Sequence, residues 1–352
     1  MKRLRNAVIR AGLDGLYVTG AHRMLRPVLG GVGLILMLHR VRPAVSDAFQ
    51  PNRHLEITPD FLRTALRHLH AQNIDIVTLD EVHRRMTAGD FTRRFASFTY
   101  DDGYRDNRDH ALPVMREFAA PLAVYVASDF AQGTGRLWWV ALERAIAATN
   151  SLDMTIDGTH VRIECSTPIT KQAAFNQAHD WLRRLPTDND VRDEVHALCV
   201  RYGIDDGAIS RELCMSWDEL RVFADDPLVT IGAHTISHCN LAHEPEEIAR
   251  QEIRISKERI ESALQKQVRH FAYPYGDKAA AGTREFATAR TLGFATAVTT
   301  RPGMIFPDHA EHLTALPRIS LNGNYQNERF LSVLTSGAAT AMWNRMRRLD
   351  VA

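Results

Sequence analysis

Short apolar segments alternate with amphipathic helical patterns along most of the chain, and this alternation restricts the available folds more than any other feature. Strands are predicted over 32–38, 75–79, 95–99, 122–126, 228–231, 269–272 and 295–299. Helices are predicted over 59–72, 244–266 and 283–292. Strands that alternate with helices form largely parallel sheets with right-handed crossovers. The pattern therefore predicts an α/β fold, either a closed barrel or an open sheet.

One region breaks this alternation. Roughly a hundred residues separate the strand ending at Val126 from the strand starting at Leu228, too many for a single crossover. They include a predicted hairpin over 154–163, around the favoured turn Asp157-Gly158, and helical patterns over 171–185 and 190–202. We interpret 133–218 as an insertion on the rim of the main domain. The predicted organisation is a basic helical segment over 1–30, the main domain over 31–132 and 219–325, and a C-terminal helix over 326–352.

The overall charge and the cysteines exclude several classes of protein. The 352 residues carry a formal net charge of +1, which gives no general attraction to nucleic acid, so no nucleic-acid partner is expected. The four cysteines form no C-x-x-C pair and no regular framework, which argues against a zinc knuckle or a disulfide scaffold. Free thiols fit a reducing compartment.

The N-terminus is basic, with Lys2, Arg3 and Arg5 ahead of any apolar segment. The first apolar run, 31–38, is far shorter than the about 20 residues of a membrane-spanning helix and lacks a cleavage-type ending. We therefore expect a cytoplasmic protein without a transmembrane segment. The basic start is interpreted as a solvated helix. The alternative is weak association with the inner membrane surface, assisted by W-N-R-M-R-R over 343–348.

The first chemical signal is F-T-Y-D-D-G-Y over 98–104. An apolar strand runs into two adjacent carboxylates, Asp101 and Asp102, and Gly103 permits a sharp turn after them. Neighbouring side chains at a strand end point in different directions, so the two carboxylates can serve different roles. They would lie at the carboxyl edge of the sheet, where active sites of α/β proteins are found. Taken alone, the segment would equally fit an ordinary polar turn.

The second signal is I-G-A-H-T-I-S-H-C-N-L over 231–241, where polar groups again follow an apolar strand. His234 and His238 are four residues apart, so one helical turn would place both imidazoles on the same side. Two imidazoles and one carboxylate make a zinc-type site with open positions for water and substrate. Histidines at this spacing are often structural, but two strand-end motifs can converge at one sheet edge. The sequence therefore favours a metal site.

A third segment, R-H-F-A-Y-P-Y-G-D over 269–277, leads a strand into a Pro-x-Gly turn. In this order, the three segments resemble the signatures of the polysaccharide deacetylase (NodB-homology) family, carbohydrate esterase family 4. The family's T-F-D-D-G is similar to 99–103, with Tyr100 in place of Phe. Its H-[ST]-x-x-H is similar to 234–238, and its R-x-P-Y is similar to 272–275.

The resemblance implies a distorted (β/α)7 barrel and metal-dependent removal of acetyl groups from N-acetylated sugars. Asp101 is then the catalytic base, and the amide of Tyr275 helps to hold the oxyanion. Asp102, His234 and His238 are then the ligands of a divalent cation. Zinc is the first candidate, with cobalt, nickel and manganese as alternatives.

Two departures from the family pattern matter. Ala272 occupies the place of the arginine that braces the catalytic aspartate, and Arg318, in L-P-R-I-S after the last predicted strand, is a candidate replacement. The family's late L-x-H is missing after Leu316, whereas 37–39 (M-L-H) is a near match early in the chain. This placement resembles the circularly permuted branch typified by poly-N-acetylglucosamine deacetylases and makes His39 the candidate general acid. We expect nearby Asp101 to favour the charged form of His39.

The substrate is less closely defined than the reaction. Aromatic residues flank the motifs and are candidate stacking surfaces for sugar rings, namely Tyr104, Trp138, Trp139 and Tyr273, although buried packing is the alternative for the tryptophans. An N-acetylated glycan is the expected partner. Two other functions remain open. One is an amidase of the same fold acting on a small non-sugar amide, and the other is an inactive glycan-binding relative, which Ala272 suggests.

Overall fold

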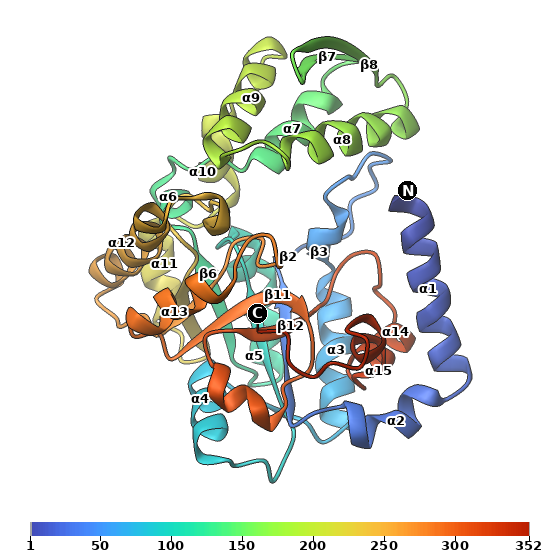
Figure 1. The fold of residues 1–352 in the computed structure, drawn as a ribbon, viewed down its shortest axis with the longest axis vertical. Helices are drawn as coiled ribbons and strands as arrows, with labels where there is room; N and C mark the ends of the chain where they lie inside the picture. Colours follow the sequence, from blue (N-terminus) through green and yellow to red (C-terminus); the bar gives the residue numbers. More distant parts are fainter. Residues whose placement is uncertain (1, 352) are drawn as a thin grey trace.

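A closed barrel of parallel strands forms the body of the protein, with the insertion above it in the view of Figure 1. The computed structural model describes residues 2–351. Within them the ring strands are β1 (Gly33–Leu38), β5 (Phe95–Tyr100), β6 (Leu122–Val126), β9 (Val229–Ala233), β10 (His270–Ala272), β11 (Thr296–Pro302) and β12 (Leu316–Ser320). Strand β1 pairs with both β12 and β5, which closes the ring. The predicted α/β class and (β/α)7 barrel are confirmed.

One predicted strand lies outside the barrel, and one strand of the barrel was not predicted. The predicted strand over 75–79 is only β4 (Asp75–Ile76), which pairs with the first residues of β5 and lies outside the ring. Strand β12 completes the ring instead. The sequence hides it because Pro317 and Arg318 interrupt its apolar pattern. Arg318 therefore lies within the last strand and not after it, as the sequence had suggested.

Helices cover the outside of the barrel, as a sheet of parallel strands requires. They are α3 (Pro59–Ala71), α4 (Leu79–Ala88), α5 (Leu112–Glu117), α6 (Ser128–Gln132), α11 (Trp217–Ala224), α12 (Glu246–Leu264) and α13 (Thr283–Thr291). The side chains of Thr58, Thr78 and Ser216 cap α3, α4 and α11 by accepting a backbone N–H of the first turn. A short parallel pair, β2 (Arg40–Val41) and β3 (Glu56–Ile57), follows β1.

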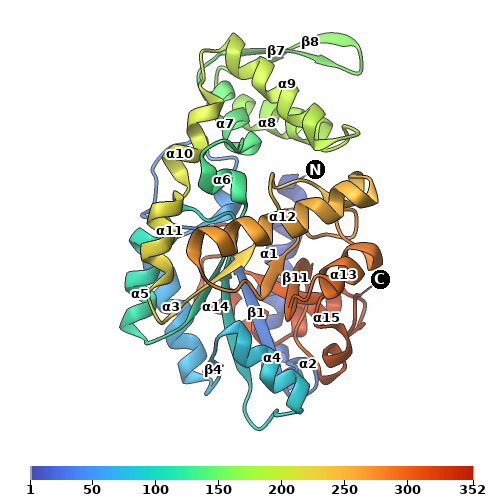
Figure 2. The ribbon, with the colours of Figure 1, turned by 90° about the vertical axis from the view of Figure 1, so that its left-hand side faces the viewer.

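The insertion forms a layer of its own above the carboxyl ends of the strands, which Figure 2 shows from the side. Its elements are α7 (Trp138–Ala147), β7 (Ser151–Ile156), β8 (Thr159–Glu164), α8 (Pro168–Leu182), α9 (Asp188–Arg201) and α10 (Ile209–Leu213). Strands β7 and β8 form the predicted hairpin, and Asp157 and Gly158 have φ of 51° and 77°, as a two-residue turn of this type needs. The insertion is built around a second apolar cluster, which includes Leu142, Phe175 and Trp181 and extends to Tyr104 and Phe130 of the main domain.

The two ends of the chain pack together on one side of the barrel. Helix α1 (Lys2–Val18) lies along α14 (Glu328–Leu334), where Leu13 contacts Phe330 and Val333, and α2 (Ala21–Leu29) lies beside α15 (Ala338–Trp343). The predicted single C-terminal helix is thus two short helices. The break falls at Gly337, whose φ of 81° no helix interior adopts.

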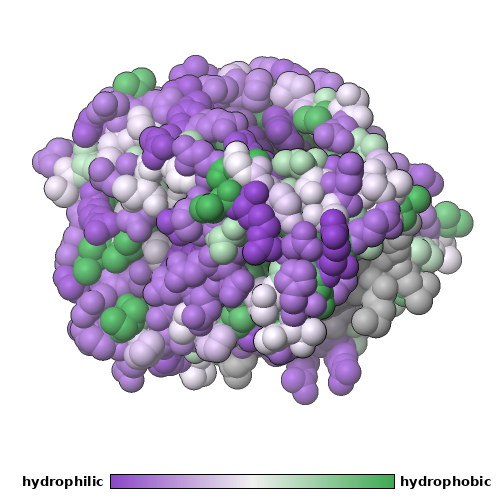
Figure 3. Space-filling model, turned by 90° about the horizontal axis from the view of Figure 1, so that it is seen from above, coloured by the Kyte–Doolittle hydropathy of each residue, from purple (hydrophilic) through white to green (hydrophobic). Residues whose placement is uncertain are grey.

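The face of the molecule that carries the insertion is mostly polar, and the cysteines are buried. Seen from above in Figure 3, side chains are mostly hydrophilic with scattered apolar ones. Between residues 2 and 351, no helix has both the length and the apolar character that crossing a bilayer requires. All four cysteines, Cys165, Cys199, Cys214 and Cys239, are buried free thiols.

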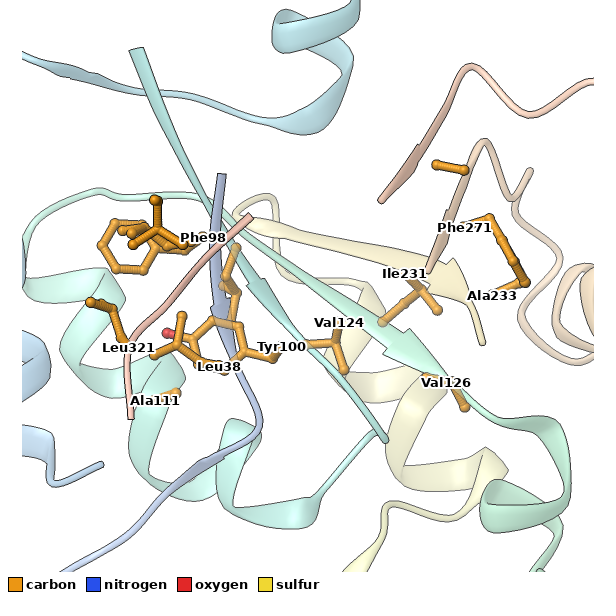
Figure 4. Close-up of a cluster of buried hydrophobic side chains, with 14 of the residues drawn as sticks. Leu38, Phe98, Tyr100, Ala111, Val124, Val126, Ile231, Ala233, Phe271 and Leu321 are labelled. Atoms are coloured by element: carbon orange, nitrogen blue, oxygen red, sulfur yellow. The ribbon is translucent and has the colours of Figure 1, made fainter. Parts of the chain in front are cut away.

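The core has two layers because strand side chains alternate between the outside and the inside of the barrel. Outward-facing residues pack beneath the helices; Leu38, Phe98 and Val124 belong to this layer and lie together in Figure 4. The inner layer contains Ile35, Tyr125 and other apolar side chains. Polar groups replace them toward the carboxyl ends of the strands, where the candidate site begins.

Candidate active site

The first half of the site, which we call the strand half, consists of His39 and Asp101, which directly follow β1 and β5, and of Arg318, which lies within β12. Arg318 is completely buried, and its Nη1 and Nη2 each donate a hydrogen bond of 2.7 Å to a different oxygen of Asp101. Its Nε donates to the carbonyl of Thr299 at 2.8 Å, and Nη1 also reaches the hydroxyl of Thr99 at 3.2 Å. The guanidinium proposed to stand in for the one missing at Ala272 therefore holds Asp101 in a bidentate pair.

This pair determines the ionisation of Asp101. Burial opposes ionisation, but the charge and hydrogen bonds of Arg318 outweigh it and hold the pKa of the carboxyl below its usual range. His39 lies with Nε2 3.9 Å from Oδ2 of Asp101. Burial lowers the pKa of His39, and Asp101 and Asp102 offset this only in part. Asp101 does favour the charged form of His39, as expected, but desolvation exceeds this attraction and the pKa of His39 is lowered overall.

The second half, which we call the loop half, consists of Asp102, His234 and His238. Oδ1 of Asp102 lies 3.5 Å from Nε2 of His234 and 3.3 Å from Nε2 of His238. All three side chains are buried, and their ligand atoms lie within 4.8 Å of one another. The two motifs, more than a hundred residues apart in the sequence, thus meet as predicted.

The surroundings of these atoms fit a cation. Nδ1 of His234 lies 2.7 Å from the carbonyl of Ala272 and must carry the proton, so Nε2 of the neutral ring presents a lone pair to Asp102. Oδ1 of Asp102 is buried and has no hydrogen-bond donor among the described residues. Two ligands held about 2.0–2.1 Å from one tetrahedral cation would lie about 3.4 Å apart. A donor set of one carboxylate and two imidazoles at this spacing fits zinc or a similar divalent ion.

The loop that carries the histidines is not the helical turn that their spacing suggested. Residues 234–240 have no regular structure, and Thr235 and His238 have φ of 65° and 60°. Asp102 and Tyr275 also adopt left-handed conformations, with φ of 72° and 59°. Each such residue costs of the order of 1–3 kcal/mol and persists only where its surroundings impose it. All three sequence motifs are therefore held by tertiary contacts and not by local propensity.

Two carboxylates supply some of those contacts. Glu252, on α12, accepts hydrogen bonds from the amides of Ile236 and Ser237 at 2.9 and 3.0 Å. Asp188, on the first turn of α9 in the insertion, accepts the amide of Asn240 and, at 3.2 Å, the hydroxyl of Tyr275. The insertion is thus bonded to two of the three motifs.

Aromatic rings enclose His238. Its imidazole lies 5.0 Å from the ring of Trp139, 5.1 Å from that of Tyr275 and 5.7 Å from that of Phe130, between ring centroids. Nε1 of Trp138 donates to the hydroxyl of Tyr275 at 2.9 Å. These rings exclude water from one side of the loop half.

The aromatic residues expected to stack on sugars are packing residues in this structure. Tyr104 and Tyr273 are completely buried, and only a few per cent of Trp138 and Trp139 is exposed. Nε1 of Trp139 donates to the hydroxyl of Tyr104 at 3.1 Å, and the hydroxyl of Tyr273 donates to the carbonyl of Thr314 at 2.8 Å. The stacking interpretation fails because the rings are buried and leave almost no surface for a sugar.

Sequence reasoning missed the supporting residues. Glu252 lies on the predicted helix over 244–266, where it looks like one more charge on a wet face. Phe130 lies just before the insertion and Asp188 lies within it. The sequence does not show how the insertion packs on the barrel, so it gives no sign that these residues contact the histidine loop. A helix-capping pattern after Thr187 was present, but it does not indicate what Asp188 contacts.

Acidic and imidazole side chains thus gather at the carboxyl ends of a closed parallel barrel, which is where the active sites of α/β barrel enzymes lie. A family model for polysaccharide deacetylases matches residues 88–296, more than half of the chain. The chain belongs to the polysaccharide deacetylase family and is a hydrolase of that type. No curated protein sequence gives a significant match.

Solved structures share the fold at low sequence identity. A Streptococcus pyogenes deacetylase, PplD, in complex with acetate is 15% identical with a TM-score of 0.55, over 83% of this chain and 92% of that one. BC0361, a polysaccharide deacetylase from Bacillus cereus, is 16% identical with a TM-score of 0.52, over 86% and 68%. IcaB from Ammonifex degensii is 17% identical with a TM-score of 0.51, over 82% and 91%. These likenesses support the fold.

Proposed function

We propose that the protein hydrolyses the N-acetyl amide of N-acetylated sugars, releasing acetate and a free amine, with a divalent cation at Asp102, His234 and His238. The observation that carries this proposal is the buried Oδ1 of Asp102, which faces two imidazole nitrogens and lacks a donor among the described residues. When bound there, zinc or a similar ion supplies Lewis acidity toward the acetyl carbonyl and toward water.

Asp101 is the general base of this proposal. Paired with Arg318, it is ionised at neutral pH, and its position beside Asp102 lets it accept the proton of the attacking water. Arg318 keeps both oxygens oriented. The amide of Tyr275 is the candidate partner of the tetrahedral oxyanion, by its place in the family motif.

His39 is the general acid of the proposal. Because burial keeps its pKa low, it begins the cycle neutral. The proton that leaves water passes from Asp101 to Nε2 of His39, 3.9 Å away, and then to the amine as the C–N bond breaks. Water thus contributes its hydroxyl to acetate and its proton to the amine, which balances the reaction.

The structure weakens one of the other two candidate functions and leaves the second open. The case for an inactive relative depended on Ala272, and Arg318 now supplies a guanidinium to Asp101 from another strand. A small non-sugar amide remains an alternative substrate, since no described contact is specific to a sugar ring.

An acetate-release assay on purified protein tests the proposal. The cation is removed with a chelator and then restored, and N-acetylglucosamine oligomers are compared with small linear and cyclic amides. We expect acetate from the oligomers only when the cation is present. Turnover confined to the small amides, or turnover unaffected by chelation, would contradict the proposal.

A further inference from the structure

A second surface, at the opposite end of the barrel from the insertion, combines features that the active site does not use. Figures 1 and 2 both place α2 and α15 toward that end, and the two helices contact each other. Helix α2 leads directly into β1, so it lies at the amino ends of the strands, whereas the candidate site lies at their carboxyl ends. We call the outer face of α2 together with residues 342–348 the basic apolar patch.

Large apolar side chains of the patch are exposed to solvent. Met24 is 81% exposed, Trp343 58% and Met346 62%. Val28 and Met342 have similar exposure, and Leu25 is 40% exposed. The inner face of α2 is anchored instead: His22 and Leu29 are buried, and Nδ1 of His22 contacts the carbonyl of Leu16 at 2.9 Å. The helix therefore presents its apolar outer side chains in a fixed position and not through fraying.

The charge of the patch has one sign. It contains five arginines, namely Arg23, Arg26, Arg345, Arg347 and Arg348. Residues 15–46 and 329–349 contain no aspartate or glutamate, although the whole chain has nearly equal numbers of acidic and basic residues. None of the five arginines forms an ion pair with a carboxylate of residues 7–351. The nearest acidic residue along the chain, Asp350, is already paired with Lys278 and Arg301.

Exposed apolar side chains together with unpaired arginines favour one kind of binding partner over the others. A second copy of the chain meeting the same patch would place five arginines against five arginines. Nucleic acid would use the arginines but not a group of exposed methionines with a tryptophan. An anionic bilayer uses both: phosphates pair with arginines, tryptophan lies at the headgroup level, and apolar side chains enter the acyl boundary.

We propose that the basic apolar patch binds reversibly to the surface of an anionic phospholipid bilayer. The patch is small, so binding depends on both charge and apolar contact and weakens with salt. Bound in this way, the barrel would turn its carboxyl end, with the candidate active site and the insertion, away from the membrane. This proposal does not depend on the proposed function.

Vesicle co-sedimentation of the full chain tests the proposal. We expect the protein to sediment with vesicles of phosphatidylcholine containing phosphatidylglycerol, to remain in solution with phosphatidylcholine alone, and to be released by high salt. Replacing three arginines, in R345Q/R347Q/R348Q, should weaken the partitioning about 100-fold, or about fivefold per charge. Trp343→Ser should weaken it as well, with no change in its salt dependence.

A matched control separates a local effect from a loss of net charge. The variant R162Q/R184Q/R250Q removes three exposed arginines elsewhere and should partition like the wild type. Unchanged circular dichroism and an unchanged midpoint of thermal unfolding show that each variant is folded. Equal binding to neutral vesicles, no binding to anionic ones, or wild-type partitioning of the triple patch variant would overturn the proposal. So would nucleic-acid binding or dimer formation through the patch without vesicle binding.

Discussion

The strand half and the loop half place two adjacent carboxylates in opposite situations. Asp101 receives two hydrogen bonds from Arg318, so the protein itself supplies its counter-charge. Oδ1 of Asp102, one residue later, faces imidazole nitrogens and has no donor among the described residues. Arg318 holds the pKa of Asp101 below its usual range despite burial, whereas the imidazole nitrogen of His234 that faces Asp102 carries a lone pair and supplies no such counter-charge. A site of this kind keeps one carboxylate for proton transfer and leaves the other for a cation.

The comparison predicts that the two carboxylates fail differently when neutralised. Asp101→Asn should keep its metal but lose turnover by a factor on the order of 10⁴, the upper range for a general base, because the amide cannot accept a proton. Acetate release under cation saturation measures this effect. Asp102→Asn is the matched neighbour and should lose bound metal together with turnover. Near-normal turnover of Asp101→Asn would show that Asp101 is not the general base.

The strand half should also be sensitive to loss of its own counter-charge. Arg318→Met would leave Asp101 buried and unpaired, which we expect to reduce the free energy of unfolding by about 3–5 kcal/mol. Urea denaturation of the chelated protein measures this loss. The double variant R318M/D101N removes both charges and should recover a substantial part of it. A single variant as stable as the wild type, or a double variant no better than the single, would show that the pair has no such role.

The loop half should depend on the insertion instead. Asp188→Asn weakens the bonds to Asn240 and Tyr275, so metal affinity should fall about 10- to 100-fold, as for other groups that orient metal ligands. Turnover at saturating cation should change much less. Asp193→Asn, on an exposed position of the same helix, is the control and should bind metal normally. Equal affinity in both variants would mean that the insertion does not hold the metal loop.

The sequence predicted the features that depend on neighbouring residues. It did not predict those that depend on contacts between residues far apart along the chain. Strand-end motifs are local, so Asp101, Asp102, His234 and His238 were found, and parallel topology then brought them together. Arg318 was predicted only as a candidate, because its partner Asp101 is far away in the sequence and only the fold brings the two side chains together. Asp188 and Glu252 could not be found, since they bind backbone amides of a loop that is shaped by two left-handed residues, Thr235 and His238, which no propensity indicates.

The smallest expected effect is a loss of stability in acid that arises from His39 in the strand half. Its pKa in the folded protein is lowered, so the unfolded chain takes up a proton first as the pH falls below about 6.5. Stability should therefore fall from pH 7 toward pH 5 in the chelated wild type, and less in His39→Gln. Since the side chain is 20% exposed, water reduces the difference. Parallel pH profiles of the two proteins, measured by urea denaturation, would contradict the burial of His39.

The most direct measurement of the central claim is a calorimetric titration of chelator-treated protein with Zn²⁺, with Co²⁺ as a spectroscopic probe. The claim is that Asp102, His234 and His238 hold a cation while Asp101 does not. It predicts one tight site per chain in the wild type and in Asp101→Asn, and no tight site in Asp102→Ala or His238→Ala. Absence of tight binding in the wild type, or unchanged binding in Asp102→Ala, would contradict it.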